Sequence, residues 1–374
     1  MTDAVLFQEM ESISDKKIGI ATLNSEKSLN ALSLDMVKLL TAKLLEWDEN
    51  DDIALIVLQG AGEKAFCAGG DVVNLYKASV EAGQGNYAQE VETFFTEEYK
   101  LDYLIHTYEK PVLLWGHGIV MGGGLGLMAG ASHRVVTEKS RIAMPEVTIG
   151  LYPDVGGTFF LNRMPNGCGL FLGLTGASIN AADALYVSLA DHFVCSDHKQ
   201  QVIEKLLVTK WGNTAALNHQ KLTDILANFE LKDKLSIPAG NIFNHSELIS
   251  SLENCERVES AVVNILDEMT SDKWFNKAQA SLAHGSALSI HLVHQQLTRG
   301  KKLTLVECFK MELGLSVQCA AVGEFTEGVR ALLIDKDNKP NWQFETVHDV
   351  DKALLDKMFT SPWANEAHPL AAIG

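Results

Sequence analysis

Two carboxylates lie in an otherwise apolar stretch of this chain. Glu146 and Asp154 belong to the segment AMPEVTIGLYPDVGG, residues 143–157, which is punctuated by proline and glycine. Ionised side chains are costly in apolar surroundings unless they have a partner or a task. A paired, partly buried acid and base could transfer a proton or activate water, whereas each carboxylate taken alone could equally cap a turn.

Two glycine-rich turns precede this segment. They are FCAGGD at residues 66–71 and GHGIVMGGGLGL at residues 116–127, and each follows an apolar run and precedes a helix-like one. Consecutive glycines weaken a helix, so close approach of a ligand or tight packing should require them. Two N–H groups from such turns could form an oxyanion hole around one carbonyl oxygen, whereas either turn alone could be purely structural. We interpret His117 as a loop or core histidine rather than as a base.

The surrounding pattern predicts the elements that position these residues. Ser33 should cap a helix whose apolar face includes Leu34, Val37, Leu40, Leu44 and Leu45. Short apolar runs predict strands at 17–23, 53–59, 111–115 and 133–137, and helices are expected at 122–130 and 170–174. This alternation indicates an α/β layered core. Helical patterns dominate after about residue 195, so we expect a core at 1–195 and a helical region at 196–374 packed on it.

Composition narrows the class of protein. The chain has 374 residues, 47% of them hydrophobic, and a formal charge of −17, which favours a globular fold and disfavours a nucleic-acid partner. Its six cysteines form no CxxC pair and no zinc spacing, so we expect reduced thiols and no metal site. We expect no membrane span, and the acidic first residues lack the features of a signal peptide, which favours the cytoplasm.

The three segments, in this order and at these separations, resemble the crotonase, or enoyl-CoA hydratase/isomerase, superfamily over residues 15–195. The resemblance implies a spiral of ββα units and two backbone N–H groups that stabilise a thioester oxyanion. Those donors fall on Gly70 and Gly123. It also implies that backbone groups at Asn30 and Ala31, and at Phe66 and Ala68, bind the adenine of coenzyme A.

Further residues resemble one branch of the superfamily, the 3-hydroxyisobutyryl-CoA hydrolases. One hydratase glutamate position is occupied by Gly126, whereas Glu146 and Asp154 match the hydrolases and also the dienoyl-CoA isomerases. The segment FFTEEYKL at 94–101 places Glu98 at a substrate-contacting position, and EFTEGVRALLIDKD at 324–337 resembles the hydrolases' C-terminal signature.

The resemblance implies hydrolysis of a short 3-hydroxyacyl-CoA in valine degradation, with Glu146, Asp154, Gly70 and Gly123 as catalytic residues. Glu98, Gly123, Glu146 and Asp154 would contact the substrate. Coenzyme A would enter as part of the substrate, so no cofactor is expected. An enoyl- or dienoyl-CoA isomerase or hydratase and a non-catalytic binding protein are the alternatives. A homo-oligomer is also left open.

Overall fold

The computed structural model describes residues 3–374, and its contacts divide the chain into two compact units. The first unit comprises the described residues up to 70, together with residues 101–142 and 179–241. The second comprises residues 71–100, 143–178 and 242–374. Each unit therefore gathers three separate stretches of the sequence. The division into 1–195 and 196–374 follows composition rather than contacts and stays a prediction.

A six-stranded sheet with the order β1-β2-β3-β5-β7-β9 forms the centre of the first unit. β1 is antiparallel to β2, and the other neighbouring strands are parallel. A second sheet has the order β4-β6-β8. The strand bounds are β1 Val5–Glu11, β2 Lys17–Leu23, β3 Ile53–Gly60, β4 Ala65–Cys67, β5 Val112–Gly116, β6 Ile119–Met121, β7 His133–Val136, β8 Arg141–Ala143 and β9 His192–Phe193.

From β3 onward, successive strands alternate between the two sheets. β3, β5 and β7 belong to the six-stranded sheet, and the strand that follows each of them belongs to the three-stranded sheet. Each such pair then leads into a helix: α2 (Val72–Ala82), α4 (Gly123–Gly130) or the 3₁₀ helix η2 (Glu146–Ile149). Parallel strands need crossover connections of this kind. The repeated ββα unit confirms the expected α/β spiral.

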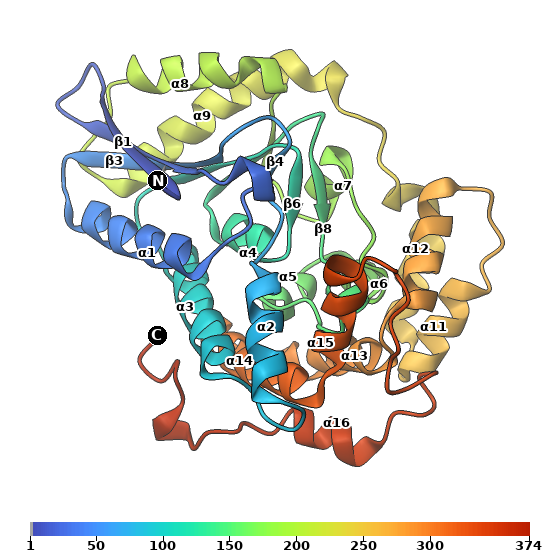
Figure 1. The fold of residues 1–374 in the computed structure, drawn as a ribbon. Helices are drawn as coiled ribbons and strands as arrows, with labels where there is room; N and C mark the ends of the chain where they lie inside the picture. The colour runs from blue at the N-terminus through green and yellow to red at the C-terminus, as the bar shows by residue number, and fades with distance from the viewer. Residues whose placement is uncertain (1–2) are drawn as a thin grey trace. The chain divides into compact units, whose positions relative to one another are not determined.

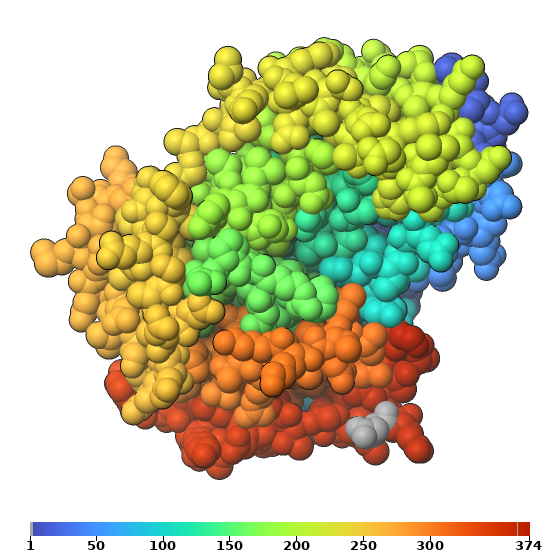
Figure 2. Space-filling view, turned by 180° about the vertical axis from the view of Figure 1, so that it is seen from behind, coloured from blue at the N-terminus to red at the C-terminus, as the bar shows by residue number. Residues whose placement is uncertain are grey.

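Two helices, α8 (Lys199–Leu207) and α9 (Ala215–Asp233), pack on one face of the six-stranded sheet (Figure 1). Their atoms form a continuous surface at the top of Figure 2. Alternate residues point to the same face of a strand, so each strand contributes every second side chain to the shared core. Most strand residues of this core follow that alternation, namely Ile18, Ile20, Leu55, Val57, Leu113, Trp115 and Val135, and Ala54 of β3 joins them.

The helix after Ser33 is α1 (Leu34–Glu49), and its start agrees with the prediction. The Ser33 hydroxyl accepts the backbone N–H of Met36 at 3.2 Å, as an N-cap residue should. One expected core position is wrong: Leu45 is 49% exposed, whereas Trp47 is fully buried. Trp47 lies three residues after the buried Leu44, so it continues the buried face that Leu45 leaves.

The second unit contains no strand beyond the end of β8 within the residues described, and this confirms the helical C-terminal region. Helix α3 (Gln89–His106) begins in this unit and ends in the first. α7 (Ala181–Tyr186) belongs to the first unit. The remaining helices of the second unit are α5 Gly157–Leu161, α6 Cys168–Thr175, α10 Ser246–Ser251, α11 Val258–Leu266, α12 Lys273–His284, α13 Ala287–Gly300, α14 Leu305–Val322, α15 Glu324–Val329 and α16 Lys352–Met358.

The C-terminal tail packs along α14. The Gln318 side chain donates to the carbonyl oxygens of Lys357 and Thr360, both at 3.0 Å. The backbone carbonyl of Lys310 is hydrogen-bonded to the ring of His368 at 3.1 Å, and Leu370 is fully buried. The tail therefore covers one side of α14. Another side of this helix contacts the segment that carries Asp154.

Candidate active site

The two glycine turns of the first unit adjoin one another. Gly69 follows β4 and has a φ of +112°, a conformation that side chains other than glycine rarely adopt. A Cβ atom at Gly69 would lie 4.0 Å from the amide nitrogen of Gly123 and 3.5 Å from the carbonyl oxygen of Met121. The structure thus brings the turn that contains Gly70 next to the turn that contains Gly123.

Close backbone packing explains the glycine run at the start of α4. A Cβ atom at Gly124 would lie 2.5 Å from the carbonyl oxygen of Cys67, so no side chain fits there. Gly123 is the first residue of α4, where backbone N–H groups have no intrahelical acceptor. Gly123 is buried, and Gly70 is partly exposed. An N–H group at a helix start can donate to an oxygen that gains negative charge.

The segments predicted to bind coenzyme A also lie together in the first unit. The amide of Ala68 donates to the carbonyl oxygen of Leu29 at 3.1 Å. The side chain of Asn30 is fully buried and donates to the carbonyl oxygens of Ala61 and Ala65, both at 3.0 Å. Its polar atoms therefore hold the loop, and the backbone amides of Asn30 and Ala31 donate within the loop to the carbonyl oxygens of Ser25 and Ser28.

The predicted residues of these two segments differ in exposure. Phe66 is fully buried and its amide donates to the carbonyl oxygen of His117, whereas Ala31 and Ala68 are partly exposed. The His117 ring is itself buried and is hydrogen-bonded to the carbonyl oxygen of Gly62 at 3.0 Å. Burial lowers the pKa of His117, which agrees with its interpretation as a core histidine.

The three predicted acids, Glu98, Glu146 and Asp154, lie together in the second unit. Their exposed fractions are 2%, 5% and 4%. Glu146 begins η2, and Glu98 lies on α3. Glu98 Oε1 and Glu146 Oε2 have no hydrogen-bond partner among the described residues. Buried carboxyl oxygens without partners are uncommon in folded proteins and mark a candidate functional site.

Burial and mutual repulsion separate the pKa values of these acids. Burial, reinforced by the charge of Asp154, raises the pKa of Glu146 and of Glu98 well above the ordinary value. Burial raises the pKa of Asp154 to about 6, because a hydrogen bond from Tyr99 offsets part of the burial cost. At neutral pH Asp154 is therefore ionised, whereas burial favours the protonated forms of Glu98 and Glu146. Acids separated in this way are suited to different roles in proton transfer.

Sequence reasoning missed four residues that support Asp154. The Tyr99 hydroxyl donates to Asp154 Oδ2 at 2.7 Å and contacts Ser316 Oγ at 2.7 Å. Tyr152 contacts the same Ser316 Oγ at 2.9 Å, and Glu312 lies one helical turn before Ser316 on α14. A glutamate in the apolar run FKMELGLSV was the signal available in the sequence, because a fully buried acid needs a reason.

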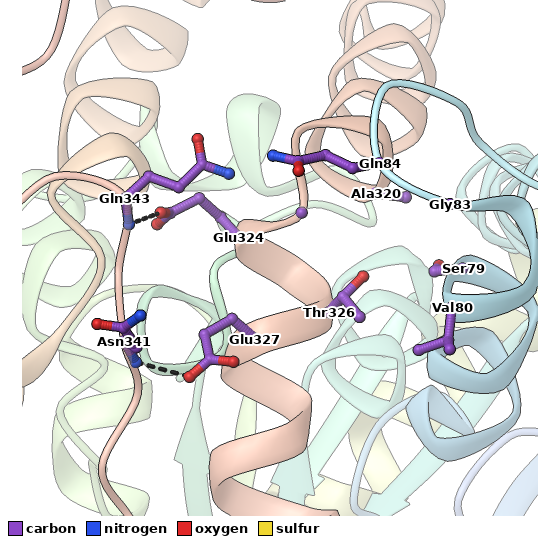
Figure 3. A pocket seen from close by; sticks show the side chains of 11 residues that line it. Ser79, Val80, Gly83, Gln84, Ala320, Glu324, Thr326, Glu327, Asn341 and Gln343 are labelled. Atoms are coloured by element: carbon purple, nitrogen blue, oxygen red, sulfur yellow. Dashed lines mark hydrogen bonds between the residues drawn. The ribbon is translucent and has the colours of Figure 1, made fainter.

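The C-terminal signature has a structural role in the second unit. Glu324 accepts the backbone amide of Gln343 at 2.7 Å, and Glu327 accepts that of Asn341 at 2.6 Å (Figure 3). Arg330 forms ion pairs with Glu327 and with two acids of the following loop. The signature therefore holds the loop that follows α15.

Glu324 and Glu327 line a pocket of about 280 Å³ between the end of α2 and α15 (Figure 3). Its other polar side chains are Ser79, Gln84, Thr326, Asn341 and Gln343. None of the three predicted acids of the second unit is among its lining residues. Across the described residues, no group of three or more metal-binding side chains could hold an ion, and no helix has the length and apolar character of a membrane span.

Comparison with known proteins identifies the family of this chain. The family model described as enoyl-CoA hydratase/isomerase matches residues 18–359. A relative from Danio rerio named 3-hydroxyisobutyryl-CoA hydrolase, mitochondrial, is 39% identical over 92% of this chain and 87% of its own.

Two crystal structures share the fold over 96% of this chain. One is an enoyl-CoA hydratase from Rhodobacter sphaeroides, with a TM-score of 0.81, 29% identity and 98% of its own chain covered. The other is a carnitinyl-CoA dehydratase from Mycobacterium thermoresistibile, with a TM-score of 0.83, 30% identity and 97% of its own chain covered. With both the spiral of ββα units and these matches in agreement, this chain belongs to the enoyl-CoA hydratase/isomerase, or crotonase, family.

Proposed function

We propose that this chain hydrolyses the thioester bond of a short 3-hydroxyacyl-CoA, with 3-hydroxyisobutyryl-CoA as its substrate. The relative from Danio rerio bears the name of this activity and aligns with most of the chain. The observation that carries the proposal is the buried set of Glu98, Glu146 and Asp154, with two carboxyl oxygens that lack partners among the described residues. Such groups are available to a substrate.

In the proposed mechanism, the thioester carbonyl oxygen accepts the backbone N–H groups of Gly70 and Gly123. These donors stabilise the negative charge that develops when the carbonyl carbon is attacked. A carboxylate oxygen of Glu146 attacks that carbon, the carbon–sulfur bond breaks, and an acyl anhydride forms. Water then hydrolyses the anhydride, which regenerates the Glu146 carboxyl group and releases the 3-hydroxy acid.

The raised pKa of Glu146 favours its protonated form, and the proton of this carboxyl group can be used by the leaving group. Glu146 must lose its proton before it attacks, and the CoA thiolate must gain one as it leaves. Asp154 accepts the first proton and delivers it to sulfur, so the exchange balances. In the alternative route Glu146 acts as a general base toward water, and the proton of that water reaches the thiolate. Glu98 orients the substrate in both routes.

Release of free thiol from 3-hydroxyisobutyryl-CoA tests the proposal. Glu146→Gln should abolish release, and Glu98→Gln should weaken it, because both remove a carboxyl group beside the acyl chain. Glu97→Gln is the matched control, since Glu97 is the partly exposed neighbour of Glu98 and pairs with Lys100. Near-normal turnover in Glu146→Gln would remove the assignment.

A single turnover in heavy-oxygen water separates the two routes. Water attack on the Glu146 carbonyl carbon of an anhydride leaves the first product unlabelled and places the label in Glu146. Direct attack of water on the thioester labels the first product at once. Mass spectrometry of the product and of the peptide that contains Glu146 distinguishes these outcomes.

Hydration or isomerisation of an unsaturated thioester is the second candidate, favoured by the names of the two crystal structures. In the hydratase pattern, one catalytic glutamate would stand at the position of Gly126, where no acid is available. Incubation with an enoyl-CoA, followed by ultraviolet absorbance and thiol titration, separates the candidates. Loss of the conjugated double bond without thiol release would favour the hydratase.

The proposed substrate places the enzyme in valine degradation. Proton transfer and water attack need no resident cofactor, so coenzyme A enters only as part of the substrate. The cytoplasmic location, the absence of a cofactor and the oligomeric state stay predictions from the sequence.

A further inference from the structure

Helix α14 presents two buried polar side chains to the segment that carries Asp154. Glu312 and Ser316 are four residues apart, so they lie on the same face of the helix. Both are fully buried. An apolar helix of this length would pack without them, and a buried acid is costly unless its hydrogen bonds compensate. Their partners therefore decide what they do.

Glu312 holds the backbone just after Asp154. Its Oε2 accepts the amide of Gly156 and its Oε1 accepts the amide of Thr158, both at 2.8 Å. These amides lie at the start of α5, where N–H groups have no intrahelical acceptor. Burial raises the pKa of Glu312 to about 8, and a two-point contact of its carboxyl group with two nearby amides fixes both position and orientation. Gln296 adds a third contact, because its side-chain amide donates to the carbonyl oxygen of Pro153 at 2.6 Å.

Ser316 contacts the Asp154 side chain through a hydroxyl chain. Its Oγ lies 2.7 Å from the Tyr99 hydroxyl and 2.9 Å from the Tyr152 hydroxyl. Tyr152 donates to the carbonyl oxygen of Glu312 at 2.6 Å, and Tyr99 contacts Asp154 at 2.7 Å. This chain of hydrogen bonds therefore begins at the Glu312 carbonyl oxygen on α14 and ends at Asp154, the acid that the mechanism uses.

A count of hydrogens shows how this chain depends on the charge of Asp154. The chain has four contacts, and its three hydroxyl groups supply three hydrogens. With Asp154 ionised, Tyr99 donates to it and one contact of Ser316 lacks a hydrogen. With Asp154 protonated, all four contacts are satisfied when each group donates to the next. The chain can thus accept either state of Asp154 when the Tyr99 and Ser316 hydroxyls change their acceptors, whereas Tyr152 donates to the Glu312 carbonyl in both states.

We propose that Glu312 and Ser316 are positioning residues that set the place and the protonation of Asp154. Glu312 fixes the main chain after Asp154, and Ser316 orients the Tyr99 hydroxyl that contacts its carboxylate. This inference rests on the proposed function, because it assigns the two residues to the same reaction. Neither residue is required to touch the substrate.

Glu312→Gln tests the anchoring of the main chain after Asp154, and Ser316→Ala tests the orientation of the Tyr99 hydroxyl. Glutamine keeps the size of Glu312 but presents one N–H group to an N–H donor, so one of the two amide contacts is lost. We expect kcat to fall roughly tenfold to a hundredfold while KM changes little, as small misplacements of a catalytic group do. Ser316→Ala should shift the acidic limb of the kcat/KM profile, because Tyr99 then loses its second partner.

Asp233→Asn is the matched control for Glu312→Gln. Asp233 is also a buried acid that accepts a backbone amide, that of Cys195 at 2.7 Å, but it belongs to the first unit. It should lower the unfolding temperature without a selective loss of kcat. Glu312→Asp, which retains a carboxylate, should recover part of the activity that Glu312→Gln loses, and a merely structural role predicts no such recovery.

Hydrogen exchange measured by mass spectrometry provides a readout independent of activity. In Glu312→Gln the peptide that contains Gly156 and Thr158 should exchange faster than in the wild type, whereas Asp233→Asn should leave it unchanged. Equal exchange in wild type and Glu312→Gln would overturn the inference. So would a Glu312→Gln enzyme with normal kcat. If the wild type releases no thiol, the proposed function fails, and the exchange result still decides whether Glu312 anchors the segment.

Discussion

Replacing Asp154 with asparagine should increase stability at pH 8 while it removes activity. Burial raises the pKa of Asp154 from 3.8 to about 6. Each pKa unit corresponds to about 1.4 kcal/mol, so keeping this carboxylate ionised costs the folded state about 3 kcal/mol. Asparagine carries no charge and still presents an oxygen to Tyr99, in a hydrogen bond weaker by about 1 kcal/mol. We expect a net gain of about 2 kcal/mol.

The sign of this effect fixes its pH dependence. A carboxyl group whose pKa is raised on folding stabilises the protein when protonated, and that advantage is lost as the pH rises from 3.8 to about 6. The gain in Asp154→Asn should therefore be small near pH 4 and should reach its full value above pH 7. Between pH 5 and pH 8 it should grow by roughly 1 kcal/mol.

Urea denaturation of both proteins at pH 5, 6, 7 and 8 measures this difference. Asp267→Asn, which replaces an exposed aspartate at the end of α11, is the control and should show no such pH-dependent gain. Thiol release should be lost only in Asp154→Asn. A difference in stability that is the same at every pH, or an Asp154→Asn protein that is less stable at pH 8, would refute the reasoning.

Three further changes test other parts of the structure. Glu146→Gln should lower thiol release at least a hundredfold and slightly raise the unfolding temperature at pH 8, because it removes a group whose pKa burial raises; release assays and thermal denaturation measure both. Gly69→Ala should destabilise the protein by about 1–3 kcal/mol and should also lower turnover, because Gly69 lies beside the Gly123 amide. Gly83→Ala, also at positive φ but with open space around it, should lower stability alone. Leu370→Ala should destabilise by about 2–5 kcal/mol with KM unchanged, because it leaves a cavity under the tail; urea denaturation checks this, and a cost below 1 kcal/mol would contradict it.

The secondary structure was largely predictable from the sequence. The strand predicted at 17–23 has those bounds in the structure, and the helix after Ser33 begins at the next residue. These signals are local, because side-chain periodicity and N-cap chemistry depend only on neighbours along the chain. Leu45 shows the limit: its spacing suited the apolar face, but Trp47 fills that part of the core. Which of two apolar residues is buried depends on the surface that the helix meets.

The sequence alone determined the order of the chemical segments: two glycine turns, an acid at Glu146 and a second acid at Asp154. The tertiary structure decided what surrounds Asp154. Tyr99 is 55 positions away from it along the chain, and Ser316 is 217 positions away from Tyr99. Contacts over such distances depend on how whole helices pack, and no local pattern encodes them. For the same reason the pKa of Asp154, which depends on burial and on the Tyr99 hydroxyl, follows from the folded structure.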